Sequence, residues 1–242
     1  MNDVVNEPSS RKNNAVLISS ILVILVAAGA GAWYYFEKGP GKTVTPDTEV
    51  STLPEIVAKV NNIEITKDAY LRNLEQLKSA YLAQGVDVTD ASSTKILEEQ
   101  ALNSLINRKV FLLAAEQANF SVEDSAVDAE YANTITSAGG DEAFKAALER
   151  TGLTEELIRT DIKEGLLIQQ YLSNQLKIDT VTVSDEEVLA YYNSVKETNP
   201  DVPAFEDVKD AVKGQLQAAK QEETINAALE KLRANVKIEI LI

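Results

Sequence analysis

The 242-residue chain contains no cysteine and no histidine. Without cysteine it forms no structural disulfide and carries no lipid-modified cysteine. Without histidine it lacks the commonest general base and zinc ligand near neutral pH. The two absences together exclude Cys–His and Ser–His catalysis. We therefore expect no catalytic residues, no metal-binding residues and no cofactor.

Positive charge is also scarce in this sequence. Lysine and arginine number 23 against 38 aspartates and glutamates, which gives a formal net charge of −15 at pH 7. Such a chain repels phosphate backbones, so we expect no nucleic-acid partner. The carboxylates are densest at 98–99, 155–156, 185–187 and 222–223. These clusters fall at helix starts or on polar faces, which indicates caps and solvated surface rather than paired acid–base catalysis.

The chain has one long apolar run, from residue 15 to residue 36. At about 1.5 Å of rise per residue, a helix of this length crosses a hydrocarbon core of about 30 Å. The run ends in Trp33-Tyr34-Tyr35-Phe36, whose rings suit the membrane–water interface. The sequence predicts a transmembrane anchor at 15–36, a cytoplasmic tail at 1–14 and a solvated tether at 37–54.

The alternative for this run is a cleaved secretory signal. Arg11 and Lys12 precede it, and small-residue cleavage patterns occur at 28–30 and 30–32. The apolar stretch continues into aromatic residues beyond both patterns, which favours the anchor. Both interpretations place the rest of the chain outside the cytoplasm. We expect a single-pass protein of the cell membrane whose bulk is extracytoplasmic.

The sequence predicts that residues 55–242 form one folding unit whose two ends pair. A strand at 56–60 and an alternating segment at 63–65 flank Asn61-Asn62, a dipeptide that suits a tight hairpin. A further alternating segment at 236–242 matches the first strand. Pairing of the first and last strands ties the ends together by backbone hydrogen bonds, so we expect the helices between them to form one body.

Nearly everything between those strands has helical periodicity. The segment from Ile96 to Leu113 has an apolar face wide enough for a central helix. The fold class is therefore mainly α with a small β-sheet. The predicted helix starts are Thr66, Ser92 or Ser93, Ser121, Asp141, Thr154, Ser184 and Phe205, and the predicted stops are Gly85, Gly139-Gly140, Gly152 and 199–203.

Two short motifs have simple structural explanations. Gly41-Lys42-Thr43 resembles the end of a phosphate-binding loop, but the first glycine of that motif would fall at Phe36, so we assign it to the tether. Ser92 and Lys95 have the S-x-x-K spacing of a serine nucleophile with a lysine base. They stand at a predicted helix start, where serine is expected as a cap.

The segment VAKVNNIEITKDAY at 57–70 resembles the opening of the N-terminal chaperone domain of SurA-like and PrsA-like foldases. Later segments agree in order: VSDEEV at 183–188 with Tyr191-Tyr192, FEDVK at 205–209 and KIEIL at 237–241 are similar to the segments that flank the family's isomerase module. The resemblance spans about 53–242. It implies a helical chaperone body from a bacterium, with unfolded or partly folded secreted or envelope polypeptides as partners.

The chain departs from the family pattern at one point. In the family, a parvulin peptidyl-prolyl isomerase domain follows the paired-tyrosine helix and precedes the last helix. Here the twelve residues 193–204 join those segments, which is too few for a domain, and the histidines of that active site are missing. The resemblance therefore implies the chaperone body without the enzyme.

The resemblance implies a holding chaperone that works without ATP, with apolar grooves between helices covering exposed apolar segments of its clients. The residues add the membrane anchor, the extracytoplasmic helical body and the lack of catalytic groups. One alternative is an enzyme, either a residual prolyl isomerase or a hydrolase built on Ser92 and Lys95. The other is an adaptor or structural protein that docks one envelope partner. The aromatic residues at helical core spacing are candidates for packing or for lining a client groove: Tyr70, Tyr81, Tyr131, Phe144, Tyr191, Tyr192 and Phe205.

Overall fold

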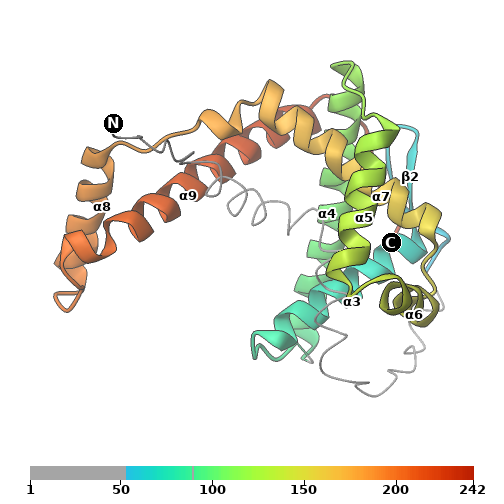
Figure 1. The fold of residues 1–242 in the computed structure, drawn as a ribbon, viewed down its shortest axis with the longest axis horizontal. Helices are drawn as coiled ribbons and strands as arrows, with labels where there is room; N and C mark the ends of the chain where they lie inside the picture. The colour runs from blue at the N-terminus through green and yellow to red at the C-terminus, as the bar shows by residue number, and fades with distance from the viewer. Residues whose placement is uncertain (1–52, 89) are drawn as a thin grey trace, which may run out of the picture.

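The computed structural model describes residues 53–88 and 90–242 (Figure 1). The predicted tail at 1–14, the anchor at 15–36 and all but the last two residues of the tether at 37–54 lie outside these residues. Within the described ranges, no helix is both long enough and apolar enough to cross a membrane.

The two ends of the described chain meet in a three-stranded antiparallel sheet. β1 (Ile56–Val60) pairs with β2 (Ile63–Thr66) on one side and with β3 (Ile238–Ile240) on the other. Asn61 turns the hairpin with a φ of 52°, a left-handed conformation that asparagine tolerates. Its backbone N–H donates to the Lys237 carbonyl at 2.7 Å, and its Oδ1 accepts from the Lys237 N–H at 2.8 Å. The predicted pairing of the first and last strands is confirmed.

Helices make up most of the remaining described chain, which confirms the mainly α class. In chain order they are α3 (Lys67–Ala83), α4 (Ala91–Gln117), α5 (Asp124–Ser137), α6 (Asp141–Thr151), α7 (Glu155–Gln170), the π-helical turn η2 (Tyr171–Gln175), the 3-10 turn η3 (Ile178–Thr180), α8 (Asp185–Thr198) and α9 (Phe205–Arg233).

Three of the predicted caps are confirmed by their hydrogen bonds. The Thr66 and Thr154 hydroxyl oxygens accept from the third backbone N–H of α3 and α7. Ser184 forms a full capping box with Glu187 at the start of α8. At the other helix ends, Gly152 ends α6 in the left-handed conformation that glycine adopts at no steric cost.

The predicted cap of α4 is wrong, because Asp90 caps this helix. One oxygen of its carboxylate accepts from the backbone N–H groups of Ser92 and Ser93, both at 3.0 Å. A carboxylate also interacts favourably with the positive end of the helix dipole, which gives Asp90 an advantage over the serine hydroxyls that follow it. The Ser93 hydroxyl also donates to the other carboxylate oxygen, and this hydrogen bond lowers the pKa of Asp90 most, followed by the backbone N–H groups of Ser93 and Ser92.

Two further starts are displaced by one or two residues. α5 begins at Asp124 after Glu123, so the hydroxyl of Ser121 does not cap it. α6 begins at Asp141, and the residue that caps it is Gly140. The Gly140 carbonyl accepts from the Phe144 N–H at 2.9 Å, and this bond starts the helix one position before the predicted cap.

α4 is the central helix, as its wide apolar face predicts. Leu97 and Ala101 in its first half pack with α3 and the sheet, whereas Phe111 and Ala115 in its second half pack with the end of α7, η2 and α9. A third apolar cluster joins α5, α6 and α7. Ile96 is the exception in α4, because 52% of its surface is exposed.

α8 and the first half of α9 extend away from the other helices as an arm (Figure 1). Three lysines of α9 pair with the first turn of α8: Lys209 and Lys213 with Asp185, at 2.9 and 3.1 Å, and Lys220 with Glu187. Residues 199–204 join the two helices at the tip of the arm (Figure 1). The sheet, α3 to α7 and the end of α9 therefore form the single body that the sequence predicts. The arm lies outside this body.

The arm projects because a two-helix hairpin has little apolar surface to offer a third element. In α8, Val188 and Tyr192 are buried, and the Tyr192 ring lies against that of Phe205 with centroids 5.2 Å apart. In α9, by contrast, the apolar side chains are half-buried or exposed, and the buried residue is the polar Gln221. Helix pairing and the lysine–carboxylate pairs therefore hold the arm straight.

Candidate functional site

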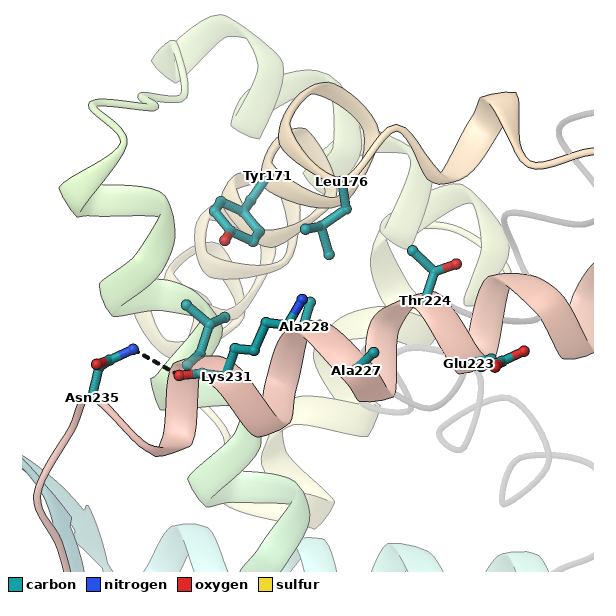
Figure 2. A pocket seen from close by; sticks show the side chains of 9 residues that line it. Tyr171, Leu176, Glu223, Thr224, Ala227, Ala228, Lys231 and Asn235 are labelled. Carbon is teal, nitrogen blue, oxygen red and sulfur yellow. Dashed lines mark hydrogen bonds between the residues drawn. The ribbon is translucent and has the colours of Figure 1, made fainter.

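A groove of about 580 Å³ lies between η2 and the second half of α9, where the arm joins the other helices (Figures 1 and 2). Tyr171 and Leu176 form one wall and point toward α9 in Figure 2. The residues that line the groove are Tyr171, Leu176, Glu223, Thr224, Ala227, Ala228, Lys231, Leu232 and Asn235.

The π-helical turn creates the aromatic wall. The Leu176 N–H donates to the Tyr171 carbonyl at 3.2 Å, five residues back, which widens the end of α7 by one residue. Tyr171 packs against Phe111 and Phe120, each with a centroid separation of 6.2 Å. Tyrosine is uncharged at neutral pH, and burial raises the pKa of the Tyr171 hydroxyl further. The wall is therefore a fixed apolar surface.

Small side chains of α9 form the floor. Thr224, Ala227 and Ala228 are spaced three and four residues apart, which places them on one face of the helix. The Thr224 hydroxyl donates to the Lys220 carbonyl at 2.8 Å and is satisfied within the helix. The alanines extend no further than Cβ, so the space opposite Leu176 stays open. The groove therefore has room for an apolar side chain.

Gln221 fixes the distance between the floor and the wall. It is the buried polar residue of α9, and its Nε2 donates to the Ile178 carbonyl of η3 at 3.0 Å. Lys177, just before η3, has a φ of 56°, which turns the chain out of η2 and along α9. The course of the backbone therefore forms the groove, which does not result from loose side-chain packing.

Polar groups at the rim come from α9 and the residues that follow it. Glu223 and Lys231 are exposed, and Asn235 donates from Nδ2 to the Lys231 carbonyl at 2.8 Å (Figure 2). Two separate side chains of opposite charge and an amide offer donors and acceptors to a peptide backbone. The site can therefore cover an apolar side chain and hydrogen-bond the chain that carries it.

The sequence motif with catalytic spacing lies elsewhere. Ser92 and Lys95 are both exposed in the first turn of α4. Phe111, the α4 residue that packs against Tyr171 of the groove wall, is about 28 Å further along the helix from Ser92 at 1.5 Å per residue. The structure does not bring the S-x-x-K pair into the groove. Among the described residues, no group of three or more carboxylate, histidine or cysteine side chains could hold a metal ion.

The aromatic residues singled out in the sequence do not line the groove. Tyr70, Tyr131, Phe144 and Tyr192 are buried, and Tyr81, Tyr191 and Phe205 are half-buried. Apart from Ile96, the apolar residues of α4 between positions 96 and 113 are likewise buried or packed against the core clusters, so the expected surplus face of this helix points inward. The groove residues were missed because Tyr171 and the α9 alanines, Ala227 and Ala228, are more than fifty residues apart in the sequence. Helical periodicity indicates which residues share a face, but not which two faces meet.

A sequence model of the SurA-like N-terminal domain matches residues 9–172, about two thirds of the chain. This chain therefore belongs to the SurA-like N-terminal domain family, as its motifs predict. The matched range includes Tyr171 of the groove wall and ends before α9.

Two curated proteins are similar to this chain. The chaperone SurA of Chromohalobacter salexigens is 26% identical over 147 residues, which cover 60% of this chain and 33% of that protein. The foldase protein PrsA of Caldanaerobacter subterraneus subsp. tengcongensis is 30% identical over 152 residues, which cover 60% of this chain and 44% of that protein. The match thus extends over less than half the length of either relative.

Proposed function

We propose that this chain is a chaperone that holds unfolded or partly folded secreted or envelope polypeptides without ATP. The observation that carries the proposal is the groove between η2 and α9, with its fixed wall of Tyr171 and Leu176 above a floor of small residues. Membership in a family whose similar relatives are named a chaperone and a foldase supports the same function.

The size of the groove favours weak and reversible binding. Full burial of one leucine or phenylalanine side chain contributes about 1.5–3 kcal/mol, which corresponds to about 10- to 100-fold in affinity. A holding chaperone that releases its client without ATP needs binding in this range at each contact. The net charge of −15 keeps the complex dispersed while the client is covered.

The cellular location is part of the same proposal. The apolar run at 15–36 anchors the chain in the cell membrane and places residues 37–242 on the extracytoplasmic side; its length and its aromatic end support this arrangement. Carbonate extraction of membranes, followed by N-terminal sequencing of the product, tests it. An extractable chain that begins just after residue 30 or 32 would instead show a cleaved signal.

We also propose that this chain has no prolyl isomerase activity of its own. Residues 199–204 are all that separates α8 from α9, where the resemblance places the isomerase module, and the chain contains no histidine. The barrier to rotation of the peptide bond is about 18–20 kcal/mol, and binding alone does not lower it. Substoichiometric amounts should therefore leave a proline-limited refolding rate unchanged; acceleration of that rate would establish the enzyme alternative.

Light scattering of a denatured model client tests the holding function. We expect residues 53–242 alone to remain in solution and, without nucleotide, to suppress aggregation at equimolar to several-fold excess. Because the groove is apolar, added salt should weaken this suppression little. If the aggregation curve does not change, the holding function is wrong, and an adaptor for one envelope partner becomes the better interpretation.

A substitution in the floor tests whether the groove is the binding site. Ala227→Arg places a long charged side chain opposite Leu176 and should reduce suppression of aggregation several-fold. Ala211→Arg is the matched control, because Ala211 is an exposed alanine of the same helix outside the groove. Arginine and alanine are both good helix formers, so neither variant should change the melting temperature appreciably. Equal activity of the two variants would place client binding elsewhere.

A further inference from the structure

The open edge of β3 is a second place on this molecule that fits an extended polypeptide. In the strand order β2-β1-β3, β1 is enclosed and β3 has a neighbour on one side only within the described chain. An edge strand presents backbone N–H and C=O groups that another strand can pair with.

The register shows which groups of β3 are available. Leu241 donates its N–H to the Val57 carbonyl at 2.9 Å, and the Lys237 carbonyl accepts from Asn61 at 2.7 Å. Hydrogen-bonded and non-bonded pairs alternate in an antiparallel ladder, so Lys237, Glu239 and Leu241 face β1. The backbone N–H and C=O of Ile238 and Ile240 therefore point toward the open side of the sheet.

Apolar side chains accompany these groups. Ile240 pairs with Ala58, yet Ala58 is completely buried whereas Ile240 is 55% exposed. The helices that cover β1 thus stop short of the end of β3. Leu241 and Ile242 are also exposed, at 48% and 45%. An added strand would find both unpaired backbone groups and an apolar surface.

We propose that the β3 edge binds an extended, apolar segment of an unfolded client as a fourth strand of the sheet, a contact that rests on the proposed holding function. Charge selects this occupant over a second copy of the chain, because two copies at −15 each repel one another. The charges next to the edge are balanced, since Lys237 pairs with Glu239. The site therefore takes neutral or basic segments, bound mainly through their backbone.

The variant Ile240→Pro tests the open edge of β3 without changing the pairing of β3 with β1. Proline removes the N–H that points outward and removes no hydrogen bond between β1 and β3, a position that edge strands accept. Leu241→Pro is the matched control, because it removes the N–H that donates to Val57. Ile240→Pro should therefore leave the melting temperature nearly unchanged, whereas Leu241→Pro should lower it.

Fluorescence anisotropy with the full-length protein in a mild detergent measures binding. The probe is a labelled ten-residue peptide of alternating valine and threonine with a lysine at each end, together with an analogue N-methylated at alternate residues. We expect Ile240→Pro to weaken binding of the unmodified peptide about tenfold. The N-methylated analogue should bind the unaltered protein as weakly as the unmodified peptide binds Ile240→Pro. Equal binding of both peptides, equal binding by Ile240→Pro, or no binding by the unaltered protein would each overturn the proposal.

Three further outcomes are distinguishable. A dimer in solution that Ile240→Pro dissociates would show that the edge pairs with a second copy, which contradicts the occupant proposed. Aggregation suppression by the unaltered protein and by Ile240→Pro alike, without peptide binding, would refute the edge and leave the holding function intact. Peptide binding at the edge without any suppression of aggregation would refute the holding function alone.

Discussion

At the scale of single residues, Asn61 joins the two ends of the described chain. It tolerates a φ of 52° in the hairpin turn, donates its N–H to Lys237 and accepts from Lys237 through its side chain. The side-chain oxygen takes the part that a backbone carbonyl plays elsewhere in the ladder, because the left-handed turn ends β1 at this point. One residue therefore serves the hairpin and the closure of the sheet.

We predict that Asn61→Ala lowers the free energy of unfolding by about 2 kcal/mol. Alanine in the left-handed region costs about 1 kcal/mol, and the lost hydrogen bond to Lys237 contributes about as much. Asn61→Gly keeps the conformation and loses only the acceptor, so it should cost about half as much. Asn62→Ala serves as the control, since the positive φ in this turn belongs to Asn61. Denaturant unfolding measures all three; equal stabilities for Asn61→Ala and Asn62→Ala would contradict this role.

The sequence predicts a helix cap correctly where no second capping side chain competes with it nearby. Thr66, Thr154 and Ser184 cap their helices as predicted. The predicted start of α4 is wrong because Asp90, Ser92 and Ser93 lie within four positions and all three residue types are good caps. The difference in cap preference between aspartate and serine is smaller than the effect of the surrounding structure. Local propensity alone therefore fixes the existence of this helix but not its first residue.

At the scale of elements, the arm depends on charged groups at the start of α8. Hydrogen bonds from Lys209 and Lys213 lower the pKa of Asp185, and a hydrogen bond from Lys220 lowers that of Glu187. A carboxylate whose pKa is lower in the folded state stabilises that state above its ordinary pKa. The contribution is lost as the pH falls through the lowered value.

We therefore predict that acid loosens α8 before it loosens α4. Amide hydrogen exchange, corrected for intrinsic rates, should show greater loss of protection in α8 than in α4 between pH 7 and about pH 3. These carboxylates are exposed, so the effect should shrink at high salt. Asp185→Asn should reduce protection of α8 at pH 7 and reduce its dependence on pH. Parallel loss of protection in both helices would refute this account of the arm.

β3 gives a second prediction at this scale. Deleting residues 237–242 removes the strand that covers β1, whose Val57, Ala58 and Val60 are completely buried. The deletion removes at least three hydrogen bonds, namely Asn61 N–H to the Lys237 carbonyl, Leu241 N–H to the Val57 carbonyl and Lys237 N–H to Asn61 Oδ1. At about 1 kcal/mol for each bond, stability should fall by about 3 kcal/mol or more. Thermal unfolding measures the change, with Lys237→Ala as the control that keeps the strand. A deletion variant with an unchanged melting temperature would show that β3 is dispensable.

The elements themselves were largely predictable from the sequence, and η2 shows where prediction stops. Periodicity and caps identify the hairpin, the closing strand and the long helices. The π-helical turn has no sequence signature, because its extra residue is stabilised by the packing of Tyr171 between Phe111 and Phe120. Since that turn sets the wall of the groove, the candidate site could not be located before the tertiary contacts were known.

At the scale of the whole molecule, α9 connects the arm, the groove and the sheet. Its first half carries the arm, its second half is the floor of the groove, and the chain that follows it closes the sheet as β3 (Figure 1). The groove between η2 and α9, the proposed client site, therefore lies where the arm meets the other helices. Holding, in this account, requires the arrangement of these parts rather than any single reactive residue.

Site-specific photo-crosslinking at position 227 tests that central claim most directly. A photoreactive residue in place of Ala227 should crosslink to a denatured client and not to the same client once folded. The same residue at position 211 of α9, outside the groove, should give little crosslinking to either form. Equal yields at the two positions, or equal yields with folded and denatured client at position 227, would contradict the account.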